Sequence, residues 1–144
     1  MADETRSDKI ALPYSLDENR REKLPVIRLK IVTPYKAYPA QWLDALIDTG
    51  FDGGLLIPPD HYRNAGLAAT ELPVEDWDIA ESITGGTTLL QAAIAEVKIQ
   101  GLEKAIELRI ETFQGNTAIL LGLNGIKTLF LCFDGPNQII LFNK

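Results

Sequence analysis

The chain has 144 residues, a formal net charge of −6 and a sequence pI of about 4.8. This acidic balance excludes nucleic acid and anionic membrane as the main partners, because both require a concentrated positive patch. The single cysteine excludes an intrachain disulfide and fits a reducing compartment. The sequence shows neither the apolar core of a signal peptide nor the roughly 20 apolar residues of a membrane span. We therefore expect a soluble, cytoplasmic protein.

The beginning of the chain differs in composition from the rest. Residues 1–23 are highly charged and contain few large apolar side chains, so we expect a flexible polar tail there. Residues 24–144 are long enough to bury one hydrophobic core and predict a single domain. Its first element is the stretch PVIRLKIVTP (25–34), whose period-two alternation between two prolines indicates a half-buried strand.

Short apolar runs separated by turn residues continue to the end of the chain. They predict, in order, a turn at 35–41, a strand at 42–50, a loop at 51–54, a short buried strand at 55–59, helical turns at 59–67, two strands within 71–101, a strand at 107–113, a buried run at 117–133 with a short helix in its middle, a turn at 133–136 and a strand at 137–142. Many short strands with little helix indicate an all-β barrel or sandwich.

The stretch ALIDTGFDGGLLIP (45–58) ends an apolar run on a carboxylate, Asp48. Because removing a carboxylate from water costs free energy, this position suggests a chemical task. Two carboxylates close together can share one proton, so that one activates a water and the other protonates a carbonyl oxygen or leaving group. Gly50 permits a close approach of the backbone, and the Thr49 hydroxyl can fix the loop by a hydrogen bond.

This stretch resembles the active-site segment of the retropepsin-like aspartic proteases of clan AA, in which apolar residues flank Asp-Thr-Gly. Two further features match that family in the same order: the glycine-rich tip ITGGTT (83–88) and the run LLGLNGI (120–126). The likeness extends over residues 25–142, and the phenylalanine after Gly50 makes bacterial single-domain members the nearer comparison. The resemblance implies an all-β, closed retropepsin-like barrel with one short helix and one lobe per chain.

The resemblance also implies an activity and an assembly. A short chain of this family supplies one aspartate, and the sequence contains one Asp-Thr-Gly. The implied protein is an aspartic endopeptidase that acts as a homodimer on a peptide or protein, without metal or cofactor. The implied catalytic residues are Asp48, which with its mate activates the water, Thr49, which links the two loops, and Gly50, whose carbonyl faces the substrate.

The same comparison implies a set of substrate-binding residues: Phe51, Asp52, Ile83, Thr84, Gly85 and Gly86. The tip from Ile83 to Thr87 would close over the substrate and exclude water, and Asp52 matches a position at which an acid contacts the substrate backbone. Two residues depart from the retroviral pattern. Phe51 replaces a small residue, so we expect its ring to narrow the cleft, and Leu123 replaces an arginine, so the dimer must be held differently.

Other interpretations stay open at this point. The same fold could be a catalytically silent dimeric module that binds peptides or serves as a scaffold. The Asp-Thr-Gly could also be an ordinary turn in an unrelated small β-barrel adaptor. The remaining polar residues predict no metal site: the acidic residues from Glu71 to Glu81 indicate a solvated edge, and His61 has no second histidine. Cys132 lies in the apolar run LFLCF, which predicts a buried, inert thiol.

Overall fold

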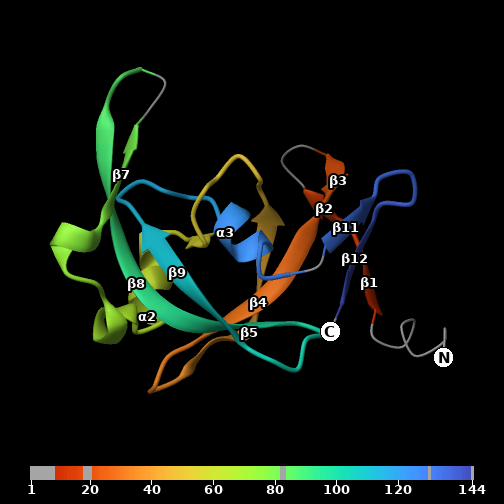
Figure 1. Ribbon diagram of the computed structural model, residues 1–144, viewed down its shortest axis with the longest axis horizontal. Helices are drawn as coiled ribbons and strands as arrows, with labels where there is room; N and C mark the ends of the chain where they lie inside the picture. Colours follow the sequence, from red (N-terminus) through yellow and green to blue (C-terminus); the bar gives the residue numbers. More distant parts are fainter. Residues whose placement is uncertain (1–8, 18–20, 82–83, 130, 144) are drawn as a thin grey trace.

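A computed structural model describes residues 9–17, 21–81, 84–129 and 131–143 (Figure 1). The described residues are mostly β-structure, which confirms the predicted all-β class. Their elements are β1 (Lys9–Pro13), β2 (Ser15–Asp17), β3 (Glu22–Leu24), β4 (Val26–Val32), β5 (Ala37–Ile47), β6 (Leu55–Leu56), α2 (Pro59–Asn64), η1 (Leu67–Thr70), η2 (Val74–Asp76), β7 (Asp78–Glu81), β8 (Thr87–Ile99), β9 (Ile106–Thr112), β10 (Leu120–Leu121), α3 (Leu123–Ile126), β11 (Leu131–Asp134) and β12 (Ile139–Asn143).

Six strands close a barrel. In the order β4-β5-β10-β6-β9-β8 each strand pairs with the next, and β8 pairs back onto β4. The pairs β5–β10 and β6–β9 are parallel, and the other four are antiparallel. Closure leaves these strands without the unpaired edges that an open sheet exposes. The closed barrel predicted from the family resemblance is confirmed.

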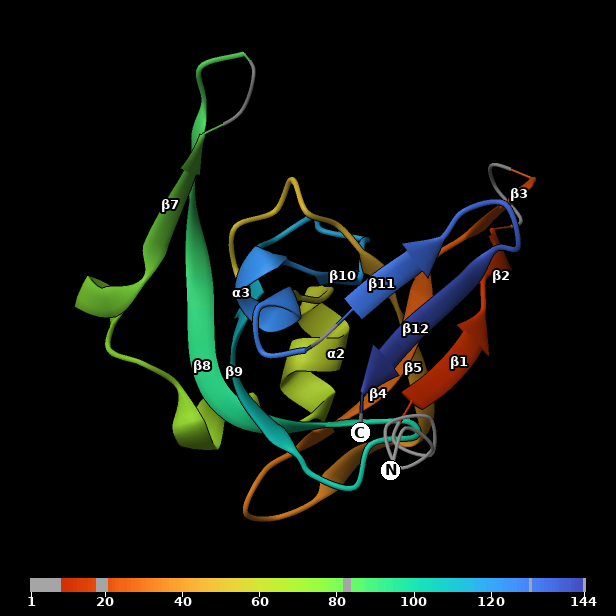
Figure 2. The ribbon, with the colours of Figure 1, turned by 45° about the vertical axis from the view of Figure 1, so that its right-hand side comes forward.

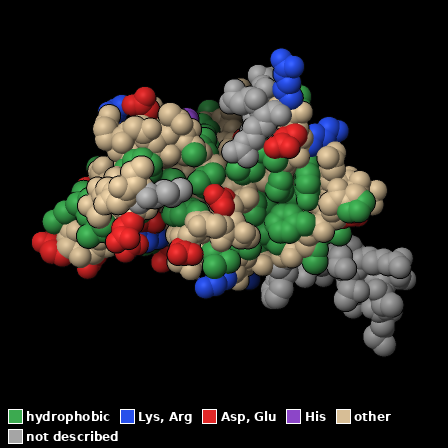
Figure 3. Space-filling view, turned by 90° about the horizontal axis from the view of Figure 1, so that it is seen from above, with side chains coloured by type: hydrophobic (Ala, Val, Ile, Leu, Met, Phe, Trp, Pro, Cys, Tyr) green, Lys and Arg blue, Asp and Glu red, His purple; other side chains and the backbone are tan. Residues whose placement is uncertain are grey.

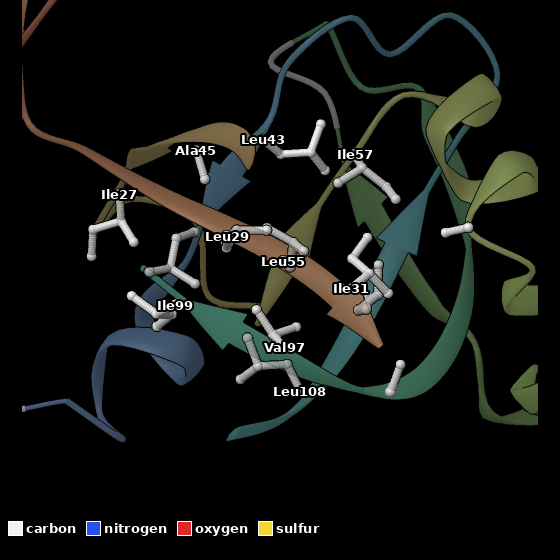
Figure 4. Packing of buried hydrophobic residues seen from close by; sticks show 14 of the residues in the cluster. Ile27, Leu29, Ile31, Leu43, Ala45, Leu55, Ile57, Val97, Ile99 and Leu108 are labelled. Carbon is white, nitrogen blue, oxygen red and sulfur yellow. The ribbon is translucent and has the colours of Figure 1, made fainter. Parts of the chain in front are cut away.

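The barrel interior is filled by the apolar residues that the alternation in 25–34 predicted. Ile27, Leu29 and Ile31 of β4 are 0% exposed, while Arg28 between them is exposed. Figure 4 shows their side chains meeting those of β5, β6, β8 and β9, including Leu55 from the strand after the Asp48 loop. The strands that bracket this loop are therefore anchored in the best-buried part of the molecule.

The barrel carries short helices and one long hairpin. α2 begins at Pro59, because proline lacks the N–H that a first helical residue leaves unpaired anyway. With six residues it is the longest helix of the described ranges, and none there is long and apolar enough to cross a membrane. β7 pairs with the first residues of β8, outside the barrel, and this hairpin rises beside the loop that follows β5 (Figures 1 and 2).

Residues near both ends of the chain form a separate three-stranded sheet, in the order β1-β12-β11. We expected structure to begin at Leu24, but β1 and β2 lie before it and β3 begins at Glu22. The reason is an alternation that the charged surroundings hide: Leu12 lies opposite Ile140 of β12 and packs against the core. Residues 137–142 were predicted as one closing strand, and β12 lies there, paired on both sides.

Two local predictions are wrong. The segment 35–41 was taken as a turn, but β5 already begins at Ala37, and the turn is closed by the Thr33 N–H donating to Lys36 O at 2.9 Å. Pro39 falls where the register of β4 and β5 shifts, a place in a sheet that tolerates a residue without an N–H. Cys132 was predicted to be buried, but it is exposed, because β11 is an edge strand of a small sheet.

If β1 contributes to stability, truncating Leu12 will show it. We expect Leu12→Ala to lower the free energy of unfolding by about 1–2 kcal/mol, because a half-buried leucine loses part of its apolar contact. Leu16→Ala is the matched control, since Leu16 is 62% exposed, and it should change stability by less than about 0.5 kcal/mol. Urea unfolding of both variants measures the difference, and equal values would contradict a stabilising role for β1.

Candidate active site

The loop with Asp48, Thr49 and Gly50 joins two strands that are not neighbours. β5 ends at Ile47 and β6 begins at Leu55, but β10 lies between them in the sheet. The loop 48–54 therefore crosses the end of β10, beside the start of α3. The two apolar runs that end near Asp48 and Gly122 are neighbours here, because the ends of β5 and β10 pair side by side in parallel.

The start of α3 binds this loop through the backbone. The first N–H groups of a helix have no partners within the helix, and here they donate to carbonyl oxygens of the loop. The bonds run from Gly122 N to Gly54 O (2.8 Å), from Leu123 N to Phe51 O (2.7 Å) and from Asn124 N to Gly53 O (3.1 Å). Loop and helix thus satisfy each other's polar groups, and the loop conformation is set by contacts that do not depend on its side chains.

Two glycines make this close approach possible. A Cβ atom at Gly122 would lie 2.3 Å from Gly53 O, and one at Gly54 would lie 2.5 Å from Arg109 O. Both distances are shorter than any real contact, and both involve backbone atoms that have little room to move. The φ of Gly122 is −90°, a value open to any residue, so the demand for glycine is steric. The matched run LLGLNGI is thereby explained by packing.

Asp48 is half-buried, and both its side chain and its backbone are hydrogen-bonded to neighbouring backbone groups. Its Oδ1 accepts a hydrogen bond from Gly50 N at 2.8 Å. Its own backbone N–H donates to Leu121 O at 3.0 Å, and its backbone carbonyl accepts from Phe51 N at 3.2 Å. The hydrogen bond to Oδ1 fixes the orientation of the carboxyl relative to the turn.

Neighbouring residues of the loop divide between surface and interior. Thr49, Gly50 and Asp52 are exposed. Phe51 is half-buried, and its ring lies against one glycine of the loop and one at the start of α3: Cβ atoms built at Gly53 and Gly122 would lie 2.4 Å and 2.5 Å from ring carbons. The ring therefore packs within its own chain, with the missing glycine side chains providing the space.

The hairpin β7–β8 carries the other predicted substrate-binding residues. Thr84, Gly85 and Gly86 are exposed at its tip, and Gly85 has a φ of +87°, which favours glycine. Ile83 lies outside the described residues. On the strands below the tip, Ile79 and Leu89 lie opposite each other and are 66% and 46% exposed. The hairpin thus presents an apolar pair as well as its glycine-rich tip.

Sequence reasoning missed one charged residue beneath the loop. Glu111 of β9 is 1% exposed, and its carboxyl reaches Gly53, because a Cβ atom there would lie 2.6 Å from Glu111 Oε1. Glu111 Oε2 lies 3.6 Å from Arg109 Nε, and the same Nε lies 3.5 Å from Asp78 Oδ2 at the start of β7. Because residues alternate in a strand, Arg109 and Glu111 lie on the same face of residues 107–113. From the sequence alone, this polar face would be expected to face solvent.

Burial raises the pKa of the Glu111 carboxyl above its ordinary value, against the opposing effect of the Arg109 charge and with a further rise from Asp78. Glu111 Oε2 has no hydrogen-bond partner, and neither does Arg109 Nε. Within the described residues, no group of three or more His, Cys, Asp or Glu side chains is placed to hold a metal ion.

The closed barrel, the strand-end Asp48 loop crossing β10 and the glycine-tipped hairpin define a retropepsin-like fold. A search of solved structures supports this assignment. The chain is similar to the retroviral EIAV protease in complex with the inhibitor HBY-793, with a TM-score of 0.51 and 17% identity over 74% of this chain and 88% of that one. The chain matches no family model and no curated protein sequence. At this identity the likeness shows the fold alone.

The contact between α3 and the loop predicts a strict glycine requirement at one position. We expect Gly122→Ala to lower the free energy of unfolding by about 2–3 kcal/mol, because its methyl group would overlap Gly53 O and the Phe51 ring. Gly135→Ala is the control, since a Cβ atom there meets nothing within 4 Å. Thermal unfolding compares the two variants. If Gly122→Ala is as stable as Gly135→Ala, the close packing of loop and helix is refuted.

Proposed function

We propose that the protein is an aspartic endopeptidase that works as a homodimer, with the two Asp48 carboxyls around one water. The observation that carries the proposal is Asp48 itself: a half-buried carboxylate at the end of β5, fixed by the Gly50 N–H, on a retropepsin-like fold. The fold supports a peptidase more than a chance turn, because the surrounding strands and α3 hold this one loop in place.

In the proposed reaction no covalent intermediate forms. The ionised Asp48 of one subunit accepts a proton from the water, whose oxygen attacks the peptide carbonyl carbon, while the protonated Asp48 of the other subunit donates to the carbonyl oxygen. The tetrahedral intermediate collapses when the leaving nitrogen takes a proton and the C–N bond breaks. The Gly50 N–H bonded to Oδ1 keeps the carboxyl in one orientation throughout.

The hairpin β7–β8 is proposed to cover the bound peptide. Its tip residues Thr84, Gly85 and Gly86 are exposed, as a closing element requires. The exposed pair Ile79 and Leu89 would lose contact with water on closure, which favours a covered state. Asp52, exposed on the Asp48 loop, is proposed to contact the substrate backbone. The EIAV protease to which the chain is similar was solved with an inhibitor bound.

The rival proposal, a silent peptide-binding module, rested on Phe51 filling the cleft. The ring instead packs against Gly53 and Gly122 of its own chain. The contacts with these two glycines account for the large ring at this position without a role in filling the cleft, and they support the peptidase over the silent module.

The second copy needs a surface to bind, and the terminal sheet offers one. Among the described residues, β11 has β12 on one side and no strand on the other. Phe133 of this edge strand is 47% exposed. Figure 3, viewed from the end that bears the hairpin tip, shows hydrophobic side chains gathered on the side where Figure 1 places this sheet. We infer that β11 pairs antiparallel with β11 of the second copy.

The decisive variant for the activity is Asp48→Asn. Asn keeps an oxygen that can accept from the Gly50 N–H, so the loop should keep its shape, but it has no carboxylate to take a proton. We expect cleavage of a peptide library at about pH 4–7 to fall by about 10³-fold or more. Glu103→Gln, a change of an exposed carboxyl between β8 and β9, should leave it intact. Pepstatin-sensitive cleavage by Asp48→Asn would refute the mechanism, and an inactive wild type would favour the silent module.

The proposed interface can be tested with the chain's single cysteine, Cys132, which is exposed on β11. Antiparallel pairing of the two β11 strands brings the two thiols within reach of a disulfide. Mild oxidation should give a covalent dimer on a non-reducing gel, absent in Cys132→Ser. Phe133→Asp should weaken the dimer by about tenfold or more in sedimentation and slow the cross-link. A strict monomer at high concentration, or a cross-link indifferent to Phe133→Asp, would contradict the interface.

A further inference from the structure

The residue with the least obvious purpose in this protein is Glu111. Within the described residues it is the one charged residue that is buried, with 1% of its surface exposed. Burial of a carboxyl opposes folding unless it is paired, hydrogen-bonded or neutral. Glu111 Oε2 has no hydrogen bond, and its nearest opposite charge, Arg109 Nε, is 3.6 Å away. A residue that costs stability at this position suggests a role in function.

On one side Glu111 touches the active-site loop. Its Oε1 occupies the space next to Gly53 into which any larger residue would project, and the edge of the Phe51 ring fills the same space. Gly53 is also the residue whose carbonyl accepts from Asn124 at the start of α3. The carboxyl of Glu111 therefore supports the loop from below, three residues beyond Gly50.

On the other side Glu111 reaches the root of the hairpin through Arg109. Arg109 Nη2 donates to Asp76 O at 2.6 Å, two residues before β7, and its Nε lies 3.5 Å from Asp78 Oδ2, at the first residue of β7. The Arg109 side chain is 26% exposed and the Asp78 side chain 65% exposed. The guanidinium thus lies between a buried carboxyl and a solvated one, and it fixes the point from which the hairpin rises.

We propose that Glu111 is a positioning residue for the proposed peptidase, which joins the Phe51–Gly53 part of the active-site loop to Arg109 and so to the root of the hairpin β7–β8. The inference rests on the proposed function, because the hairpin matters to catalysis only if it closes over a substrate at Asp48. No atom of Glu111 has to touch the substrate. Its effect is on where the hairpin stands relative to the loop.

The protonation state of Glu111 decides how Arg109 is shared. Burial holds the pKa of Glu111 above 4.5, its ordinary value. The charged groups that act on it in the described chain are Arg109 on its own strand and Asp78 on β7. When Glu111 is neutral, Arg109 forms its ion pair with Asp78, and Glu111 still lies between the loop and Arg109 as an uncharged polar group. When Glu111 ionises, two carboxylates compete for one guanidinium, and one of them is out of water.

The sign of the resulting pH dependence follows from the raised pKa. The folded protein keeps the Glu111 proton at pH values at which the unfolded chain has lost it. The stability that the folded protein gains from keeping this proton is full below about pH 4.5. It is lost as the pH rises through the higher pKa of Glu111 in the folded state. Glu111→Gln cannot ionise, so it should remove this loss while keeping the size and shape of the side chain.

The first test measures stability and needs no activity. Wild type, Glu111→Gln and Glu107→Gln are melted at several pH values from 4 to 8. Glu107 lies on the same strand and is exposed, so Glu107→Gln should follow wild type. Glu111→Gln should match wild type near pH 4 and exceed it by about 4 °C in Tm near pH 8. Parallel curves for wild type and Glu111→Gln would overturn the assignment of a buried, titrating carboxyl.

The second test separates positioning from simple stability. Hydrogen exchange of the β7 and β8 amides should become at least about tenfold faster in Glu111→Ala than in Glu107→Ala, because the joint to Arg109 is lost, while β4 stays protected. With a cleaved peptide in hand, Glu111→Ala should raise KM about tenfold with a smaller change in kcat. Glu111→Gln should keep kcat/KM within about twofold at acidic pH. In the pH profile of kcat/KM, the decline on the alkaline side should begin at a higher pH for this variant.

The outcomes distinguish this inference from the proposed function. If the wild type cleaves no peptide but exchange in the hairpin depends on Glu111, the joint stands and the peptidase proposal fails. If cleavage depends on Asp48 but neither KM, the pH profile nor hairpin exchange responds to Glu111, the positioning role is overturned. Should Glu111→Ala fail to fold, Glu111→Gln still tests the role through its pH profile, and an unchanged profile would then overturn it.

Discussion

The three backbone hydrogen bonds between the start of α3 and the loop 48–54 are the constraint on which the rest of the site depends. They link a loop that has left β5 to a helix that has just left β10. Because they use N–H groups that a helix cannot satisfy itself, the loop gains partners without any side chain of its own. The side chains of the loop are consequently left to serve other purposes, Asp48 above all.

The same constraint explains why the glycines cluster. Gly53 and Gly54 approach the start of α3 and the backbone of β9, and Gly122 approaches both the loop and the Phe51 ring. A ring as large as that of Phe51 fits at this point because two neighbours lack side chains. The Phe51 ring occupies the space that side chains at Gly53 and Gly122 would otherwise fill, so the large residue and the two glycines depend on each other.

Sequence alone was sufficient for the parts of this fold that repeat a local pattern. The alternation in 25–34 predicted β4, and the helical pattern at 59–67 predicted α2. The matched runs around Asp48 and Gly122 marked β5 and β10, but their parallel pairing was seen only in the structure. What failed needed tertiary information. β1 was missed because it forms a strand by pairing with β12, where Leu12 lies opposite Ile140, more than a hundred residues away.

Glu111 was missed for a related reason. In a strand that alternates, Arg109 and Glu111 share the polar parity, and polar parity ordinarily faces water. Here that face is covered by the Asp48 loop and by the segment that leads into β7. The local sequence around Glu111 cannot show that this face is covered, because the covering segments lie more than 30 residues away in the chain. Only the assembled barrel shows that this carboxyl is enclosed.

The pairing of β1 with β12 has a consequence for how two copies could meet. Among the described residues, each chain pairs both edges of β12 within itself. Association through β11, as proposed, would therefore leave the pairing of β1 with β12 intact in each copy. In such a system dilution separates subunits but does not unfold them. The catalytic unit would appear and disappear with protein concentration alone, while the folded subunit remains available throughout.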